Sequence, residues 1–249
     1  MLSKSQISFV KSLHQKKFRK EHALFIVEGI KSVTEFLQSD YIVDTVYCTE
    51  NLLPKLGNLS QKIQPQLISS TDLDRISMLT TPQQILALVK MPVNGRFNRQ
   101  NLRGNFSLVL DNVQDPGNLG TIIRTADWFG IKNIICSKDT VELYNPKVVQ
   151  ASMGSLPRIK IFYTNLAELL NDCPVPVYGA LLNGESIYQT NFGNEGIVVL
   201  GNEGNGISGE ILRLISKPVT IPSFGKAESL NVAISASIIC SEIKRKFSK

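Results

Sequence analysis

The fold of this chain is decided by the stretch Ser107-Leu-Val-Leu-Asp-Asn-Val-Gln-Asp-Pro-Gly-Asn-Leu-Gly-Thr-Ile-Ile-Arg-Thr-Ala-Asp-Trp-Phe-Gly-Ile-Lys-Asn-Ile-Ile-Cys136. It contains a short apolar strand (residues 107–110), a loop, a helix (residues 119–129) and a second apolar strand (residues 133–136). Short, fully apolar strands are typical of a parallel sheet that is covered on both faces. The stretch therefore predicts a strand-helix-strand unit and an α/β fold.

The same alternation continues to the end of the chain, with strands and helices following each other in turn. Such alternation predicts a mostly parallel sheet with helices on both faces. The further predicted strands are residues 158–163, 175–182, 197–200 and 218–221, and the further predicted helices are residues 146–153, residues 166–170, one from Ser208 and one from about Asn231.

The front of the chain predicts a smaller α/β unit. A strand followed by a helix occupies residues 24–37, two more strands occupy residues 41–48 and 85–91, and a helix lies near residues 70–79. Residues 94–104 are polar and rich in Gly and Asn, which is typical of a linker. We therefore predict two domains, residues 1–98 and residues 99–249.

The composition is that of a soluble globular protein, with 43% hydrophobic and 19% charged residues in 249. No apolar run is long enough to span a membrane, and the first residues lack the pattern of a signal peptide, so we expect a cytoplasmic protein. The four cysteines are scattered and there are only two histidines. We therefore expect reduced thiols and no metal site.

The net charge of +6 is confined to the front of the chain. Residues 1–103 hold 14 Lys and Arg against 8 Asp and Glu, whereas the remaining residues hold 13 of each sign. A run of like charges is often only a solvated helix face. Because the excess lies in one region, we expect it to bind phosphate groups. The patch contains Lys11, Lys16, Lys17, Arg19 and Lys20.

Three loops carry the residues that suggest chemistry, because each follows a predicted strand and precedes a predicted helix. The first spans Asp111 to Arg124, the second is Leu200-Gly-Asn-Glu-Gly-Asn-Gly-Ile-Ser208, and the third begins at Ile221. The glycine spacing of the second loop is neither a dinucleotide fingerprint nor a P-loop. Small residues after the third loop, among them Ala233 and Ala236, indicate tight internal packing or a subunit interface.

Together these loops resemble the three motifs of the SpoU/TrmH class of knotted RNA methyltransferases, in order, spacing and residue identity. The matching segments are D-N-V-Q-D-P-G-N-L-G-T-I-I-R-T-A, G-N-E-G-N-G-I-S and I-P-S-F-G-K-A-E-S-L-N-V-A-I-S-A. The front segment is similar to the substrate-binding domain, shaped like a small ribosomal protein, that many members carry. The resemblance implies a trefoil knot in the second domain, a homodimer, and S-adenosylmethionine as the methyl donor.

The resemblance also implies the function and the site. It implies methylation of a ribose 2′-hydroxyl, in ribosomal RNA rather than transfer RNA because of the front domain. The implied catalytic residues are Asn118, Arg124, Glu203, Ser229 and Asn231, and the implied cofactor contacts are Leu182, Gly201, Ile221 and Leu230.

Other functions remain open at this point. An inactive RNA-binding module of ribosome assembly would need damaged motifs, whereas all five catalytic positions are intact. A knotted enzyme that methylates a base nitrogen of transfer RNA would differ in the first loop. A nicotinamide-dependent enzyme has the wrong glycine spacing.

Overall fold

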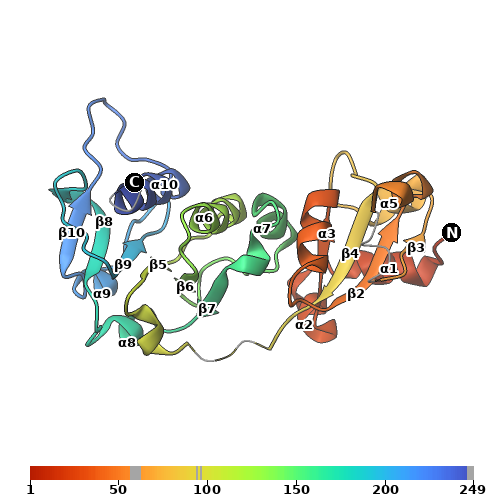
Figure 1. Cartoon of the computed structure of the whole chain (residues 1–249), viewed down its shortest axis with the longest axis horizontal. Helices are drawn as coiled ribbons and strands as arrows, with labels where there is room; N and C mark the ends of the chain where they lie inside the picture. Colours follow the sequence, from red (N-terminus) through yellow and green to blue (C-terminus); the bar gives the residue numbers. More distant parts are fainter. Residues whose placement is uncertain (57–62, 94, 96, 246–249) are drawn as a thin grey trace. The chain divides into compact units, whose positions relative to one another are not determined.

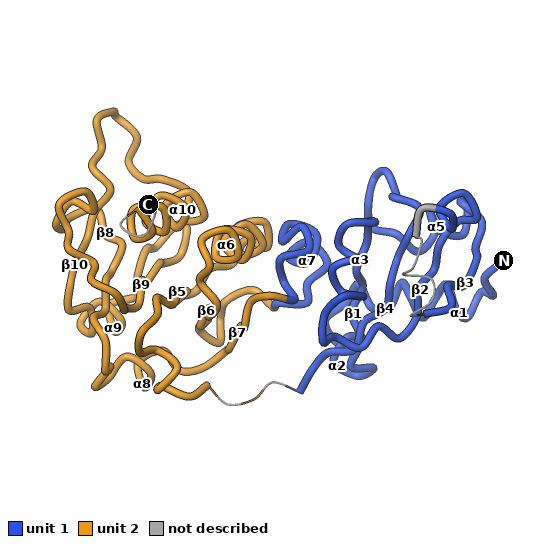
Figure 2. Tube along the Cα trace, viewed as in Figure 1, with its two compact units in different colours: residues 1–93, 143–157 blue, residues 94–142, 158–249 orange. Residues whose placement is uncertain are grey.

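The computed structural model describes residues 1–56, 63–93, 95 and 97–245 (Figure 1). The chain forms two compact units (Figure 2). The first unit consists of residues 1–93 and 143–157, and the second of residues 94–142 and 158–249. The division predicted from the sequence, residues 1–98 and 99–249, stays a prediction. In the structure, residues 143–157 pack with residues 1–93 in the first unit.

The first unit is built on a four-stranded sheet with the order β1-β4-β2-β3. β4 runs antiparallel to both of its neighbours, and Ile26 of β1 pairs with Leu88 of β4. One core cluster contains these two residues with Val10 and Leu73 from helices. The described elements are α1 (Lys4–Ser12), α2 (Lys16–His22), β1 (Leu24–Glu28), α3 (Ile30–Leu37), β2 (Val43–Cys48), η1 (Glu50–Leu52), α4 (Leu53–Leu56), β3 (Gln66–Leu67), α5 (Ser70–Ile76), β4 (Ile85–Lys90) and α7 (Pro146–Ala151).

The second unit is built on a six-stranded sheet with the order β10-β8-β9-β5-β6-β7, in which every pair of neighbours is parallel. Helices α6 and α10 lie on one face, and α8 and α9 on the other (Figure 1). The elements are η3 (Arg99–Leu102), β5 (Phe106–Leu110), α6 (Pro116–Trp128), β6 (Asn133–Cys136), β7 (Lys160–Tyr163), α8 (Leu166–Leu170), β8 (Val177–Ser186), β9 (Gly196–Leu200), α9 (Gly209–Leu212), β10 (Lys217–Thr220) and α10 (Val232–Arg245). The boundary between the two units falls within η4 (Leu156–Arg158).

The predicted α/β class and the sheet covered on both faces are confirmed, and the trefoil knot stays a prediction. α6 begins earlier and β8 ends later than predicted. α6 begins at Pro116 because Asp115 caps its first turn and the proline fits the first helical position. β8 continues to Ser186 because its outer half pairs with β10 after a register shift.

The predicted linker, residues 94–104, includes residues 94 and 96, which lie outside the described residues. Its second half contains η3, and Leu102 there is fully buried in the core of the second unit, with Val109 and Val199 among its cluster. Burying such a side chain contributes about 2 kcal/mol. Leu102 therefore anchors η3 to the core of the second unit.

The helices α6 and α10 pack closely against each other through small residues. Ala233 and Ala236 are buried, and the hydroxyls of Thr125 and Ser237 lie 2.9 Å apart. Of the two explanations for the small residues, tight internal packing is thus observed. Among the described helices, none combines the length and apolar character that a membrane span requires.

Arg19 differs from the other basic residues that were predicted to bind RNA. It is only 2% exposed, and its guanidinium donates hydrogen bonds to the carbonyl oxygens of Leu13 and His14 at 3.0 and 2.8 Å. Lys16, Lys17 and Lys20 are exposed. Arg19 therefore joins α1 to α2, and its burial does not fit the predicted surface role.

We expect Arg19→Ala to destabilise the protein by roughly 2 kcal/mol or more, because it leaves buried carbonyl groups without their charged donor. The matched variant Lys20→Ala should change stability by no more than about 0.5 kcal/mol. Urea unfolding followed by circular dichroism measures both. Equal stability of the two variants would contradict the structural role of Arg19.

Candidate active site

The first two motif loops meet at the carboxyl edge of the parallel sheet, where β5 and β9 end side by side. The backbone N–H of Asp111 donates to the carbonyl oxygen of Leu200 at 2.9 Å. The Asp111 carboxylate in turn accepts a hydrogen bond from the backbone N–H of Ser208 at 2.7 Å. Asp111 is 6% exposed, and this partly buried contact holds the two loops together.

Three of the predicted catalytic residues, one from each motif loop, form a continuous chain of hydrogen bonds. The Asn118 amide Nδ2 donates to Oε1 of Glu203 at 2.9 Å. The Asn118 Oδ1 accepts from Nδ2 of Asn231, also at 2.9 Å. A carboxylate can only accept hydrogen bonds, so Glu203 fixes which way the Asn118 amide points. That orientation in turn leaves the Asn118 oxygen for Asn231.

The backbone of the first loop also binds Glu203. The N–H groups of Gln114 and Asp115 donate to its two carboxylate oxygens at 3.3 and 3.2 Å. Desolvation raises the pKa of Glu203, but hydrogen bonds from the Asn118 side chain and from backbone N–H groups outweigh it and lower that pKa below 4.5. Glu203 is therefore a carboxylate at neutral pH, suited to fixing dipoles and not to donating a proton.

Helix caps hold the two asparagines in place. The Asp115 side chain accepts from the backbone N–H of Asn118 at 2.8 Å, at the start of α6. The Asn231 Oδ1 accepts from the N–H of Ala233 at 2.9 Å, at the start of α10. Asn231 thus caps α10 with one side-chain atom and contacts Asn118 with another, so helix capping and a role in the site are compatible.

The glycines of the second loop allow a close backbone turn. A Cβ on Gly201 would lie 2.2 Å from the carbonyl carbon of Gly206, so no other residue fits there. The backbone N–H groups of Asn202 and Gly206 each donate to the other's carbonyl oxygen, at 2.9 and 3.0 Å. Gly201 directly follows β9, so its bare backbone lies at the edge where the motif loops meet.

The other predicted residues lie around this edge but outside the hydrogen-bonded chain. Arg124 is exposed on α6 and has no hydrogen bond or ion pair with any described residue. Ser229 is exposed, and Leu230 is 47% exposed. Ile221 directly follows β10, and Leu182 is 74% exposed on β8.

The last residue of β10 is hydrogen-bonded to the middle of β8. The Thr220 hydroxyl, next to Ile221, donates to the carbonyl oxygen of Leu182 at 3.1 Å.

Two residues that position the site were not singled out from the sequence. Asp111 holds the second loop, and Asn202 donates from Nδ2 to the carbonyl oxygen of Asn112 at 2.8 Å. Asp111 and Asn202 each lie just after the end of a strand, and this position was the feature of the sequence that could have identified them. Neither contact could be foreseen, because the pairing of β5 with β9 joins segments about 90 residues apart.

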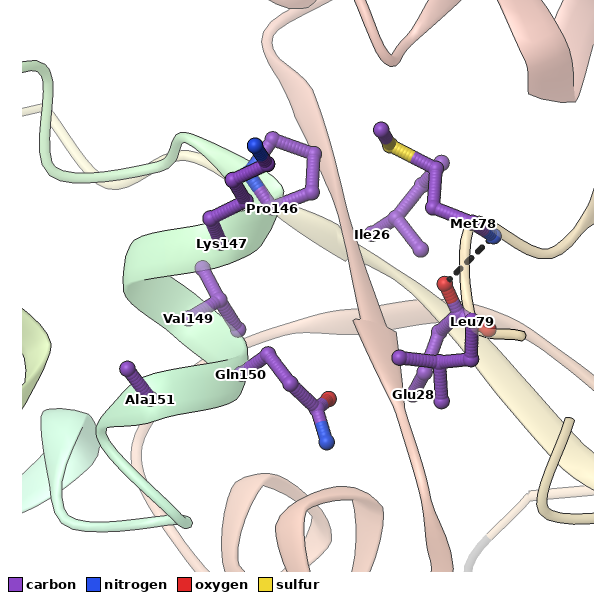
Figure 3. Close-up of a pocket in the computed structure, with 9 residues that line it drawn as sticks. All are labelled: Ile26, Glu28, Met78, Leu79, Pro146, Lys147, Val149, Gln150 and Ala151. Carbon is purple, nitrogen blue, oxygen red and sulfur yellow. Dashed lines mark hydrogen bonds between the residues drawn. The ribbon is translucent and has the colours of Figure 1, made fainter. Parts of the chain in front are cut away.

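A pocket of about 250 Å³ lies within the first unit, between β1 and α7 (Figure 3). Glu28 is buried there and accepts hydrogen bonds from the Ser77 hydroxyl and, at 3.1 Å, from the backbone N–H of Met78. Burial raises the pKa of Glu28 despite both bonds. No predicted site residue lines this pocket, so it takes no part in the candidate site. Its lining residues are Ile26, Glu28, Met78, Leu79, Pro146, Lys147, Val149, Gln150 and Ala151.

No cluster of three or more His, Cys, Asp or Glu side chains in the described part of the chain is arranged to hold a metal ion. The polar groups of the site are amides, one carboxylate and one exposed guanidinium. These groups can orient an oxygen nucleophile and stabilise negative charge on it.

Comparison with known proteins finds two family models along the chain. The model described as SpoU rRNA Methylase family matches residues 105–241, and the one described as MRM3-like substrate binding domain matches residues 4–87. The 23S rRNA (guanosine(2553)-2'-O)-methyltransferase RlmP of Bacillus subtilis is 34% identical, over 92% of this chain and 92% of its own length.

Solved structures agree with these matches. A TrmH-family protein from Porphyromonas gingivalis has a TM-score of 0.87 and 41% identity, over 99% of each chain. The AdoMet-bound rRNA methyltransferase from Sinorhizobium meliloti has a TM-score of 0.86 and 26% identity, over 100% of this chain and 97% of its own.

We expect Glu203→Gln to lower the unfolding free energy at neutral pH by about 1 kcal/mol, because an NH₂ group replaces an oxygen that accepts backbone N–H bonds. Asp139→Asn, an exposed change in the same unit, is the control and should have little effect.

The lowered pKa of Glu203 fixes the pH dependence of this difference. Its carboxylate stabilises the fold above pH 4.5, and that stabilisation is lost as the pH falls through the lowered pKa. Thermal unfolding of both variants between pH 3 and 7 is the measurement, with the pH limits set roughly around the usual Glu range. A difference that persists unchanged at the lowest pH would show that Glu203 acts by packing alone.

Proposed function

Because the chain belongs to the SpoU rRNA methylase family, we propose that it transfers a methyl group from S-adenosylmethionine to a ribose 2′-hydroxyl of ribosomal RNA. The family foreseen from the three motifs is thereby confirmed. The observation that carries the proposal is the hydrogen-bonded chain of Glu203, Asn118 and Asn231, which joins all three motif loops at one sheet edge.

Two features favour ribosomal RNA over the other substrates that were considered. The relative RlmP is named for 23S rRNA, and residues 4–87 match a substrate-binding domain. An inactive RNA-binding module is disfavoured because the predicted polar chain is intact and fully hydrogen-bonded. Methylation of transfer RNA instead of ribosomal RNA is one outcome that the experiment below can detect.

The edge of the sheet fits a cofactor that is held largely by backbone. Gly201 has no space for a side chain, and the exposed Leu182 and Leu230 offer apolar contacts for an adenine ring. We assign Leu182, Gly201, Ile221 and Leu230 to hold S-adenosylmethionine. When it is bound, the cofactor supplies an electrophilic methyl group on a sulfonium.

We assign Arg124 to the ribose hydroxyl and a neighbouring phosphate. An arginine side chain remains a cation, so it orients the hydroxyl and stabilises the oxygen while the proton passes to solvent water, and Arg124 is not itself the base. Arg124 is free to do this because no described residue pairs with it. Asn118, Glu203 and Asn231 fix the loops around the reacting oxygen, and the exposed Ser229 hydroxyl lies in the third loop to contact substrate.

The working unit is proposed to be a homodimer that forms through the second unit and acts in the cytoplasm. The small residues of α10 are already used inside the chain, so the dimer needs other contacts. Phe224 is 95% exposed and Ile234 is 52% exposed, and large apolar side chains in such positions are candidates for an interface.

Single-turnover methylation of ribosomal RNA from cells that lack the protein tests the function. We expect 2′-O-methyl nucleosides, detected by mass spectrometry after nuclease digestion. Arg124→Ala should lower the rate about 100-fold or more and leave cofactor affinity within a few-fold, because the group acts in the transfer step. Arg124→Lys should rescue poorly, since lysine lacks the planar fork.

Arg213→Ala, an exposed arginine in the same unit, is the matched control and should keep full activity. Methyl groups found on a base nitrogen, or only on transfer RNA, would overturn the proposed substrate. Near wild-type activity of Arg124→Ala would move the transfer role to Ser229, Asn231 and Glu203.

The front unit is proposed to bind RNA phosphates through Lys16, Lys17 and Lys20. Replacing all three by Ala should weaken RNA binding and reduce the slope of log affinity against log salt by about 2 to 3, because each phosphate contact releases roughly one counterion. The triple Lys→Arg variant keeps the charges and should keep the slope. An unchanged slope in the Ala variant would show that these lysines form only a solvated face.

A further inference from the structure

The exposed face of α6 carries an aromatic side chain that the proposed function leaves unused. Trp128 is the single tryptophan of the chain and is 84% exposed. Large aromatic side chains normally bury most of their surface, so their exposure signals a contact with another molecule. The neighbouring buried positions of the helix, Thr125 and Ala126, already supply its packing. Trp128 therefore adds little to the stability of the fold.

The position of Trp128 relates it to the reacting group. It follows Arg124 by four residues on the same helix, so the two side chains are neighbours on one face, with about 5 to 6 Å between their Cβ atoms. Thr121, also exposed, lies three residues before Arg124 on this face. The helix thus presents a stripe of Thr121, Arg124 and Trp128 that leads away from Asn118.

The end of α6 that carries Trp128 is firmly held. Asp127 binds the Arg158 guanidinium through both oxygens, with Nε 3.0 Å from each and Nη2 2.8 Å from Oδ2. Ile131, buried just past the helix, donates its N–H to the carbonyl oxygen of Ala126 at 2.8 Å. The indole is therefore presented from a fixed backbone, which lowers the entropy cost of contact with a ligand.

We propose that Trp128 is a binding site for an unstacked base of the substrate RNA, next to the ribose that Arg124 orients. The inference rests on the proposed function and extends it to a residue that positions the RNA. Single-stranded RNA is recognised by stacking its bases on aromatic side chains, which tolerates any base because every base has a π face. Arg124 beside the indole adds attraction for the phosphate between the two nucleotides.

Because Trp128 is the only tryptophan, its fluorescence reports on this site alone. The probe is a short single-stranded RNA that contains the nucleotide found to be methylated in ribosomal RNA. We expect titration with this RNA to quench the emission strongly and saturably. Arg124→Ala should still be quenched although it methylates much more slowly than the wild type. Methylation by the wild type without any quenching would overturn the stacking site and leave the proposed function standing. Quenching without methylation would leave the stacking site standing and overturn the proposed function.

Substitution gives the second arm of the test. Trp128→Ala should raise the dissociation constant for this RNA about 5-fold to 100-fold, the scale of losing one stacked base, and Trp128→Phe should recover most of the affinity. Cofactor affinity and the unfolding midpoint should not change. Tyr188→Ala removes another exposed aromatic ring of the same unit and is the matched control, with unchanged RNA affinity.

A subunit contact is the competing explanation for the exposed indole. In that case emission of the free protein would shift to the red on dilution, and light scattering would show that Trp128→Ala is monomeric. Either result would overturn the proposal. A wild-type oligomer whose emission is independent of concentration, and which Trp128→Ala preserves, supports it.

Discussion

The site depends on one constraint: three loops from distant parts of the chain must meet at a single sheet edge and hold their polar groups in one orientation. The parallel pairing of β5 with β9 supplies the meeting point, since parallel strands end at the same edge. Hydrogen bonds from Asn118 to Glu203 and from Asn231 to Asn118 then fix the orientation. Each partner has a unique donor or acceptor role, so reversing one amide would break the next bond.

The packing of α6 against α10 makes this chain of bonds possible. Asn118 lies in the first turn of α6 and Asn231 caps α10, so their separation is set by how closely the two helices approach. Ala233 and Ala236 permit a close approach, and the Thr125 and Ser237 hydroxyls bond across it. A larger residue at either alanine would separate the asparagines. The small residues are thus a structural requirement of the chemistry.

Much of the fold and part of the site were predictable from local sequence. Apolar runs such as residues 133–136 gave strands at the predicted positions, and the three motifs identified Asn118, Glu203 and Asn231 before the structure joined them. Contacts between distant segments were not predictable. Asp111 was not singled out because its partner Ser208 lies 97 residues away in the sequence. Arg19 was predicted to be a surface cation because it lies in a run of basic residues. The charge pattern does not reveal that its guanidinium is buried against the carbonyl oxygens of Leu13 and His14.

The same helix that begins in the site also ends at an exposed, rigid aromatic ring, and this arrangement separates two demands on an RNA enzyme. The Asn118 side chain at the start of α6 is held by hydrogen bonds to Glu203 and Asn231, which fix its orientation beside the reacting atoms. Arg124 and Trp128 are exposed on its later turns and cost the fold little. Because one rigid helix connects both, a nucleotide captured at Trp128 is carried into register with Arg124 without a conformational change in the protein.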